Sequence, residues 1–327
     1  MNRRRRSIIL AGAAGLAGIG PAAIGPARAQ PRWPTRPIRI VIPYAPGGPV
    51  EIPGRFLAEH LAQRLGQPVI VETRPGAGGA VGTKQVMATT DGHSFIMVTG
   101  AVCIQPAVQP DIGYDPTLDL APVSLISEST MGFAVRANHR FRDIPGLLAA
   151  ARAEPGRVTY GSSGNGTTTH MAAALFGVRA GINWQHVPYR GGGQLVSAFL
   201  AGDVDVMSAD LATILPHTRE GRAVLISVTT AGRAAAVPDV PSMAEFVPGT
   251  GIAIWFAMMG PRSTPREVAD RLVAEMAPLR QGSPLGERMA AAGGRLLLTG
   301  PDELDARIRQ ELPTWRQVVA EANIRPE

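Results

Sequence analysis

Four turns rich in glycine and hydroxyl side chains are the segments of this 327-residue chain that could do chemistry: residues 43–51, 99–101, 161–170 and 188–194. Glycine lets the backbone come close to a ligand. A turn that leads into a helix also presents unpaired N–H groups at the positive end of the helix dipole. Together the turns predict a site for a small carboxylate, although each one alone is equally well explained as an ordinary connection between elements.

A catalytic use of the same turns is a second hypothesis. Ser162, His170, Tyr189 and Asp210 could supply a nucleophile, a base and an acid, because such groups can come together in any chain order. Their spacing does not force them into contact. The chain has no dinucleotide-binding fingerprint, no Walker loop, no G-x-S-x-G elbow and no cluster at metal-ligand spacing, so we expect neither cofactor nor metal.

The elements that must position these turns alternate between strand and helix. The run at 38–42 is rich in β-branched residues and predicts a strand, and the leucines spaced four apart in 54–65 predict a helix. This alternation continues to residue 228, and a last helix begins at Asp302, where Pro313 should kink or interrupt it. The pattern predicts an α/β protein with mostly parallel sheets flanked by helices, in which ligands bind beyond the carboxyl ends of the strands.

Two segments are expected to cross between lobes, near residues 126–131 and 228–234. If both are hinges, one lobe comprises 31–126 together with 230–327, and the other comprises 127–229. Asp210 follows a predicted strand and precedes a predicted helix, so it is expected to cap that helix and to face the cleft.

The N-terminus has the parts of a secretory signal. Four arginines precede an apolar stretch at 8–25, and Ala27-Arg28-Ala29 forms an A-x-A cleavage pattern, so residues 1–29 are predicted to be removed on export to the periplasm. An uncleaved anchor is the alternative, and the sequence leaves the choice between the Sec and twin-arginine routes open. Five of the 32 basic side chains are the arginines of this segment. Without them the chain has 27 basic and 26 acidic side chains, and this near-neutral balance argues against nucleic-acid binding. The single cysteine, Cys103, lies in an apolar run and is expected in the core.

Several motifs in order resemble the Bug family, the periplasmic solute-binding subunits of tripartite tricarboxylate transporters. They begin at residues 33, 43, 66, 74, 160, 186, 202 and 238 and are WPTRPIR, PYAPGG, GQPVIVE, RPGAGG, YGSSGNG, HVPYRG, GDVDVM and PDVP. The resemblance covers nearly all of residues 33–327. It implies a two-lobed type II periplasmic binding fold, without catalysis, that closes on a di- or tricarboxylate, an aromatic acid or an amino acid.

The resemblance also implies which residues contact the ligand. Thr99 and Gly100 are added because they belong to the second of the four turns. The expected ligand-binding residues are Tyr44, Ala45, Gly47, Gly48, Pro49, Glu51, Thr99, Gly100, Ser162, Asn165, Thr167, Thr168, Thr169, His170, Tyr189, Arg190, Gly191 and Asp210. Relatives often carry an aspartate where this chain has Glu51 and an asparagine where it has Gln105. Glu51 would either repel a second carboxylate, pair with a ligand amine or simply favour the helix dipole.

The expected partners are a small organic acid and the permease subunits of a tripartite tricarboxylate transporter, with no nucleic acid, and the protein is expected to be a monomer. An adaptor that signals to a membrane sensor would have the same fold and cleft, and the sequence does not separate these two roles.

Overall fold

The computed structural model describes residues 33–44, 50–291 and 293–326. The chain divides after Trp33, and the helices and strands of the described residues lie in the part from Pro34 to Glu327. The predicted signal peptide, 1–29, and the predicted binding residues Ala45, Gly47, Gly48 and Pro49 lie outside the described residues. Within the described ranges, no helix combines the length and the apolar character needed to span a membrane.

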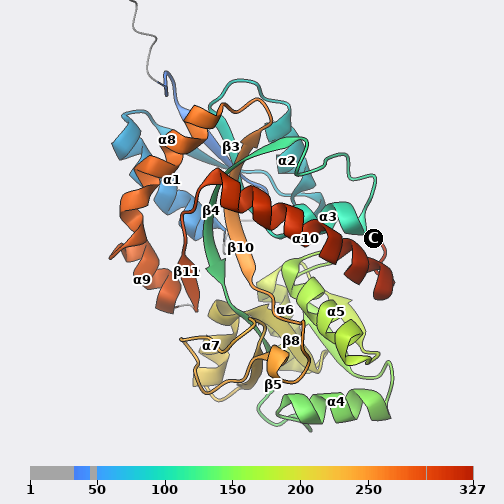
Figure 1. The fold of residues 1–327 in the computed structure, drawn as a ribbon. Helices are drawn as coiled ribbons and strands as arrows, with labels where there is room; N and C mark the ends of the chain where they lie inside the picture. The colour runs from blue at the N-terminus through green and yellow to red at the C-terminus, as the bar shows by residue number, and fades with distance from the viewer. Residues whose placement is uncertain (1–32, 45–49, 292, 327) are drawn as a thin grey trace, which may run out of the picture. The chain divides into compact units, whose positions relative to one another are not determined.

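The first sheet has six strands in the order β11-β4-β10-β3-β1-β2 (Figure 1). Its strands are β1 (Ile38–Ile42), β2 (Val69–Thr73), β3 (Ser94–Thr99), β4 (Leu120–Ser129), β10 (Ile254–Pro261) and β11 (Gly294–Leu296). β1 is parallel to β2 and β3, whereas β10 is antiparallel to β3 and β4. Thr99 therefore ends its strand at the same sheet edge as Ile42, which precedes the first glycine-rich turn.

The second sheet has five strands in the order β7-β6-β8-β5-β9. Its strands are β5 (Met131–Arg136), β6 (Thr159–Ser162), β7 (Gln185–Pro188), β8 (Val206–Asp210) and β9 (Ala223–Val228). β6 is parallel to β7 and β8, and β5 is antiparallel to β8 and β9. The carboxyl ends of β6, β7 and β8 thus meet at one edge and bring the third turn, the fourth turn and Asp210 to the same side.

Helices connect and cover the strands of the described residues. They are α1 (Glu51–Leu65), α2 (Ala80–Met87), α3 (Ala101–Val108), α4 (Ile144–Ala153), α5 (Thr168–Ala180), α6 (Gly192–Ala201), α7 (Leu211–Arg219), α8 (Arg266–Met276), α9 (Pro284–Ala291) and α10 (Pro301–Glu321), with short 3₁₀ turns η1 (Ala77–Gly79), η2 (Met243–Glu245) and η3 (Ala277–Arg280). α10 packs against β4 and α3, and it also contacts α5 (Figure 1).

The α/β fold with two sheets is confirmed, but two details differ from expectation, namely the strand directions and the course of α10. Each sheet is mixed rather than mostly parallel, because β10 and β5 run antiparallel to their neighbours. The apolar run that holds Cys103 is a helix, α3, and Cys103 is buried as expected. α10 is not interrupted at Pro313; its packing against β4 and α3 outweighs the loss of one backbone hydrogen bond.

Candidate functional site

The first and second turns are joined by Tyr44 and Thr99. The Tyr44 phenol oxygen lies 3.0 Å from the Thr99 hydroxyl and accepts a hydrogen bond from the Thr99 N–H at 3.2 Å. The Thr99 hydroxyl in turn accepts from the N–H of Ala101, in the first turn of α3. Burial raises the pKa of Tyr44, so this phenol remains protonated. These bonds hold the N-terminus of α3 beside the segment that follows β1.

The third turn is held together by its own hydroxyl groups. Thr167 is the N-cap of α5: its hydroxyl accepts from the His170 N–H at 3.3 Å and donates to the Gly164 carbonyl at 2.7 Å. The Thr169 hydroxyl accepts from the Ser163 N–H at 3.2 Å and also lies 2.8 Å from the Ser163 hydroxyl. Side-chain hydrogen bonds of this kind fix a turn whose backbone has few partners of its own.

Two stacked histidines lie behind the third turn. The rings of His170 and His186 are 3.7 Å apart and nearly parallel, at 4°. Nδ1 of His170 accepts from the Gly166 N–H at 3.1 Å, and Nε2 of His186 lies 2.7 Å from the Ser162 hydroxyl. Burial lowers the pKa of His170 to about 3 and that of His186 to about 4, so both rings are neutral at pH 7.

This geometry bears on the hydrolase hypothesis. Ser162 hydrogen-bonds to His186 and to Gly164, not to His170 as that hypothesis requires. His186 has too low a pKa to serve as an efficient base at neutral pH. The pair therefore braces the turn.

The fourth turn is docked on the third. The N–H groups of Tyr189 and Gly191 donate to the carbonyls of Ser162 and Ser163, at 3.1 and 3.2 Å. Gly191 precedes α6 with φ of +92°, a conformation that favours glycine. The Arg190 side chain is exposed, and the backbone N–H of Arg190 donates to the side-chain oxygen of Gln194.

The second and third turns, which come from different sheets, meet at Gly100 and Thr168. A side chain built on Gly100 would place its Cβ 3.5 Å from the Thr168 hydroxyl and 3.2 Å from Nε1 of Trp255. Thr168 is the first residue of α5 and is buried, and its hydroxyl has no hydrogen-bond partner within the described residues. Gly100, the N-cap of α3, therefore lies close to the first residue of α5.

Asp210 ends β8 and occupies the N-cap position of α7, but its side chain forms no capping hydrogen bond. Its Oδ1 is buried and has no partner among the residues that the structure describes. Burial raises the pKa of this carboxyl to about 6. Alternation along β8 puts Asp210 on the same face as Ser208, whose hydroxyl donates to the Thr169 carbonyl at 2.7 Å.

Two predicted residues have side-chain partners away from Gly100 and Thr168. Glu51 begins α1 and accepts a hydrogen bond from Arg55, one turn along, at 2.6 Å. Asn165 donates from its side chain to the carbonyl of Arg325 at 3.1 Å. Both positions are in the predicted turns, but these bonds direct their side chains to α1 and to the C-terminal segment.

Gln105 is a residue that sequence reasoning did not explain. It is buried in α3 and donates to the Gly166 carbonyl at 3.3 Å. A Cβ on Gly78 or Gly166 would lie 2.3 or 2.7 Å from its Nε2, so the amide is enclosed between two glycines. Gln105 thus joins α3 to the third turn, and only the two glycines far away in sequence could have pointed to this role.

A search for three or more histidine, cysteine, aspartate or glutamate side chains that could hold a metal finds none among the described residues. Around Gly100 and Thr168 the polar groups are hydroxyls and backbone N–H groups, and Asp210 adds a carboxyl at the end of β8. This set is suited to hydrogen bonding a small ligand rather than to coordinating a metal.

Comparison with known proteins agrees with this chemistry. A family model described as "Tripartite tricarboxylate transporter family receptor" matches residues 54–321. The chain belongs to this receptor family. BugT of Bordetella pertussis is 30% identical over 293 residues, which are 88% of this chain and 90% of BugT. The resemblance to the Bug family is thereby confirmed.

Solved structures of two Rhodopseudomonas palustris proteins are similar to this receptor-family chain. A protein solved with adipate is 28% identical with a TM-score of 0.82, over 90% of this chain and all of that one. MatC with bound malate is 27% identical with a TM-score of 0.79, over 88% of this chain and all of that one. The two-lobed periplasmic binding fold and membership of a family of solute-binding receptors are therefore established for this chain.

Proposed function

We propose that this protein is a periplasmic solute-binding protein that captures a small carboxylate and delivers it, chemically unaltered, to the permease of a tripartite tricarboxylate transporter. The observation that carries the proposal is the buried Thr168 hydroxyl, which lies against Gly100 without a hydrogen-bond partner among the described residues. It marks the place where helix N-termini from the two sheets oppose one another.

Helix N-termini favour an anion at this place. The N–H of His170 is bonded to Thr167, whereas the first N–H groups of a helix, here those of Thr168 and Thr169, have no intrahelical acceptor. A carboxylate between α3 and α5 would accept from such N–H groups and from Thr168, and both helix dipoles would favour its charge. Tyr44 and Thr99 supply a fixed wall for the site.

Asp210 is suited to a different part of the ligand. With a pKa of about 6 it is mostly ionised at pH 7, and its buried Oδ1 still needs a donor. A hydroxyl or an ammonium group on the ligand would supply one, whereas a second carboxylate at this position would be repelled. The proposed ligand is therefore a hydroxy acid or an amino acid held by one carboxylate.

Capture would involve movement of two lobes. In the proposal one lobe comprises 31–126 with 230–327 and the other 127–229, and the crossings lie near 126–131 and 228–234. The consecutive strands β4 and β5, which end and begin at Ser129 and Met131, belong to different sheets, which supports the first crossing. Closure removes water from the N–H groups and links ligand binding to a conformation that a permease can recognise.

Isothermal titration calorimetry at pH 7 with protein purified from the periplasm tests the proposal. The panel is malate, adipate, citrate, glutamate and benzoate. We expect micromolar or tighter binding for at least one acid that carries a hydroxyl or ammonium group, and weaker binding for adipate. Failure of every acid to bind a folded protein would overturn the carboxylate proposal, and preferential binding of adipate would overturn the role of Asp210.

A further inference from the structure

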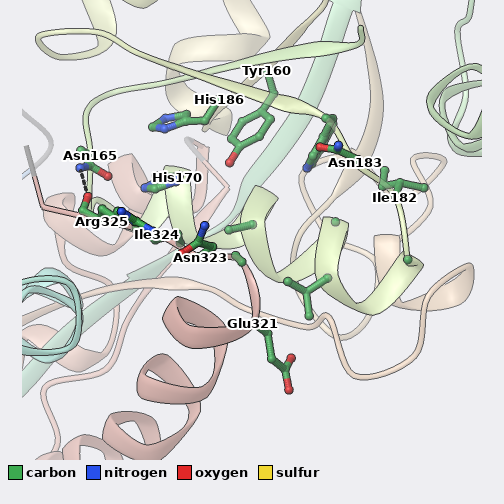
Figure 2. A pocket seen from close by; sticks show the side chains of 16 residues that line it. Tyr160, Asn165, His170, Ile182, Asn183, His186, Glu321, Asn323, Ile324 and Arg325 are labelled. Atoms are coloured by element: carbon green, nitrogen blue, oxygen red, sulfur yellow. Dashed lines mark hydrogen bonds between the residues drawn. The ribbon is translucent and has the colours of Figure 1, made fainter. Parts of the chain in front are cut away.

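A cavity lies beside the third turn and α5. Its volume is about 600 Å³. One wall consists of a face of α5 with residues of β6, β7 and the segment before β7. The other consists of Glu321, the last residue of α10, and residues 322–325 that follow it (Figure 2). This volume is within the range of about 300–1,000 Å³ that ligand pockets span.

Three of the aromatic side chains that line this cavity carry a hydrogen-bond donor. Tyr160, His170 and Trp184 are 4%, 3% and 9% exposed, so each is at least nine-tenths buried. The Tyr160 hydroxyl, Nε2 of His170 and Nε1 of Trp184 form no hydrogen bond with any described residue, and they are not among the unpartnered atoms that are sealed from solvent. None of the three donors is therefore sealed from solvent, and Nε1 of Trp184 lies against Gly177 of α5.

The protonation of His170 follows from its geometry. Because Nδ1 accepts from the Gly166 N–H, the neutral ring carries its proton on Nε2 and donates from there. Stacking on the neutral ring of His186 removes any nearby positive charge from this wall. The charged residues that line the cavity are Glu321 and Arg325, of opposite sign and both exposed.

Apolar groups form part of the remaining lining, beside the polar side chains of Asn165, Asn183 and Asn323. Ala174, Gly177 and Val178 present one face of α5, and Ile182 and Ile324 lie beside them (Figure 2). A flat ring can pack on such a face while an oxygen on it accepts from the aromatic donors. A carboxylate would have to be desolvated here without a buried cation, which costs more than the burial of a neutral oxygen.

We infer that this cavity is a second ligand site, separate from the carboxylate site, for an uncharged ring compound that presents a carbonyl oxygen. Its ligand would touch both walls. The C-terminal wall is held by the bond from Asn165 to Arg325, and Ile324 packs on the core cluster of the first sheet. Occupation of the cavity would therefore stabilise the contact between α5 and the end of α10.

Saturation-transfer NMR on the wild-type protein, with benzamide as the probe, tests the inference. Benzoate has the same ring with a charge, and toluene has the ring without an acceptor. We expect benzamide to bind at least fivefold more tightly than either compound. No binding of benzamide, or equal binding of benzoate or toluene, would overturn the inference.

Three variants test whether benzamide binds in this cavity. Tyr160→Phe removes an hydroxyl that has no protein partner, so it should fold normally and weaken benzamide binding about fivefold. Val178→Trp should fill the cavity and abolish binding. Arg179→Ala, at an exposed position of the same helix, is the matched control and should change nothing. Unchanged benzamide binding in both Tyr160→Phe and Val178→Trp would overturn the assignment. Calorimetry of organic acids on Tyr160→Phe reports separately on the carboxylate site.

Discussion

The polar groups around the N-terminus of α5 form two sets, one with hydrogen-bond partners in the described chain and one without. Behind the turn, Thr167, Thr169 and His170 exchange hydrogen bonds with their neighbours. Towards Gly100, Thr168 has a buried hydroxyl with no partner in the described part of the chain, and Asp210 has an equally unpartnered carboxylate oxygen at the end of β8. Buried polar atoms are normally paired, so the first group holds the turn in shape, and the second is the basis of the proposed ligand site.

The largest expected effect is that of a variant that tests whether Gln105 stabilises the third turn. Gly166→Ala would force alanine to adopt φ of +65° and would place its Cβ 2.7 Å from Nε2 of Gln105, so the bond from Gln105 would be lost. We expect a loss of about 4 kcal/mol in the free energy of unfolding, measured by urea denaturation.

Gly181→Ala is the matched control for this prediction. Its φ of +62° is nearly the same, but a Cβ at this position meets nothing within 4 Å. Only the backbone strain remains, so we expect a loss of about 1 kcal/mol. Equal losses for the two variants would show that Gln105 does not brace the turn.

Lowering the pH should change the free energy of unfolding in one direction through His170 and His186 and in the opposite direction through Asp210. His170 and His186 have pKa values of about 3 and 4, below the ordinary 6.5, so the unfolded chain binds more protons than the folded one. The stability that depends on these neutral rings is fully present above pH 6.5 and is lost as the pH falls towards 4. Between pH 6.5 and 5 the free energy of unfolding should fall by about 3 kcal/mol because of the pair. His186→Phe keeps a stacked ring without a titrating group and should lose less stability over the same range.

Asp210 contributes with the reverse sign. Its pKa of about 6 lies above the ordinary 3.8, so the folded state binds the proton more readily and gains stability as the pH falls through 6. Asp210→Asn removes this gain and should make the loss on acidification about 1 kcal/mol larger than in the wild type. Urea denaturation at pH 6.5 and pH 5 measures both variants, and an unchanged loss in Asp210→Asn would contradict the prediction.

The smallest expected change in stability is that of Thr168→Val, and its neighbour Thr169→Val serves as the comparison. Thr169→Val leaves the Ser163 N–H without its acceptor and should cost about 2 kcal/mol of stability. Thr168→Val removes an hydroxyl that bonds to no described residue, so stability should change by less than about 0.5 kcal/mol. Affinity for the organic acid should nevertheless fall about tenfold in Thr168→Val, as measured by calorimetry. A stable Thr168→Val with unchanged affinity would remove Thr168 from the ligand site.

The sequence predicted much of the architecture because its signals are local. The leucine spacing of α1 and the β-branched run of β1 located these elements, and the glycines after β6 and β7 located the third and fourth turns. Strand direction was harder to predict. The antiparallel placement of β10 and β5 depends on which strands pair across the fold, and an apolar run carries no information about direction.

The sequence by itself determined the alternating elements, the glycine-rich turns and the family, because periodicity, turn chemistry and motif order are written in neighbouring residues. Only the tertiary structure decided which polar groups are satisfied. Ser162 finds His186, 24 residues away, and Gln105 finds Gly166, 61 residues away, while Thr168 finds no partner in the described chain. Such pairings depend on how the sheets pack, and one threonine therefore holds a turn while the next one is the residue that we propose contacts the ligand.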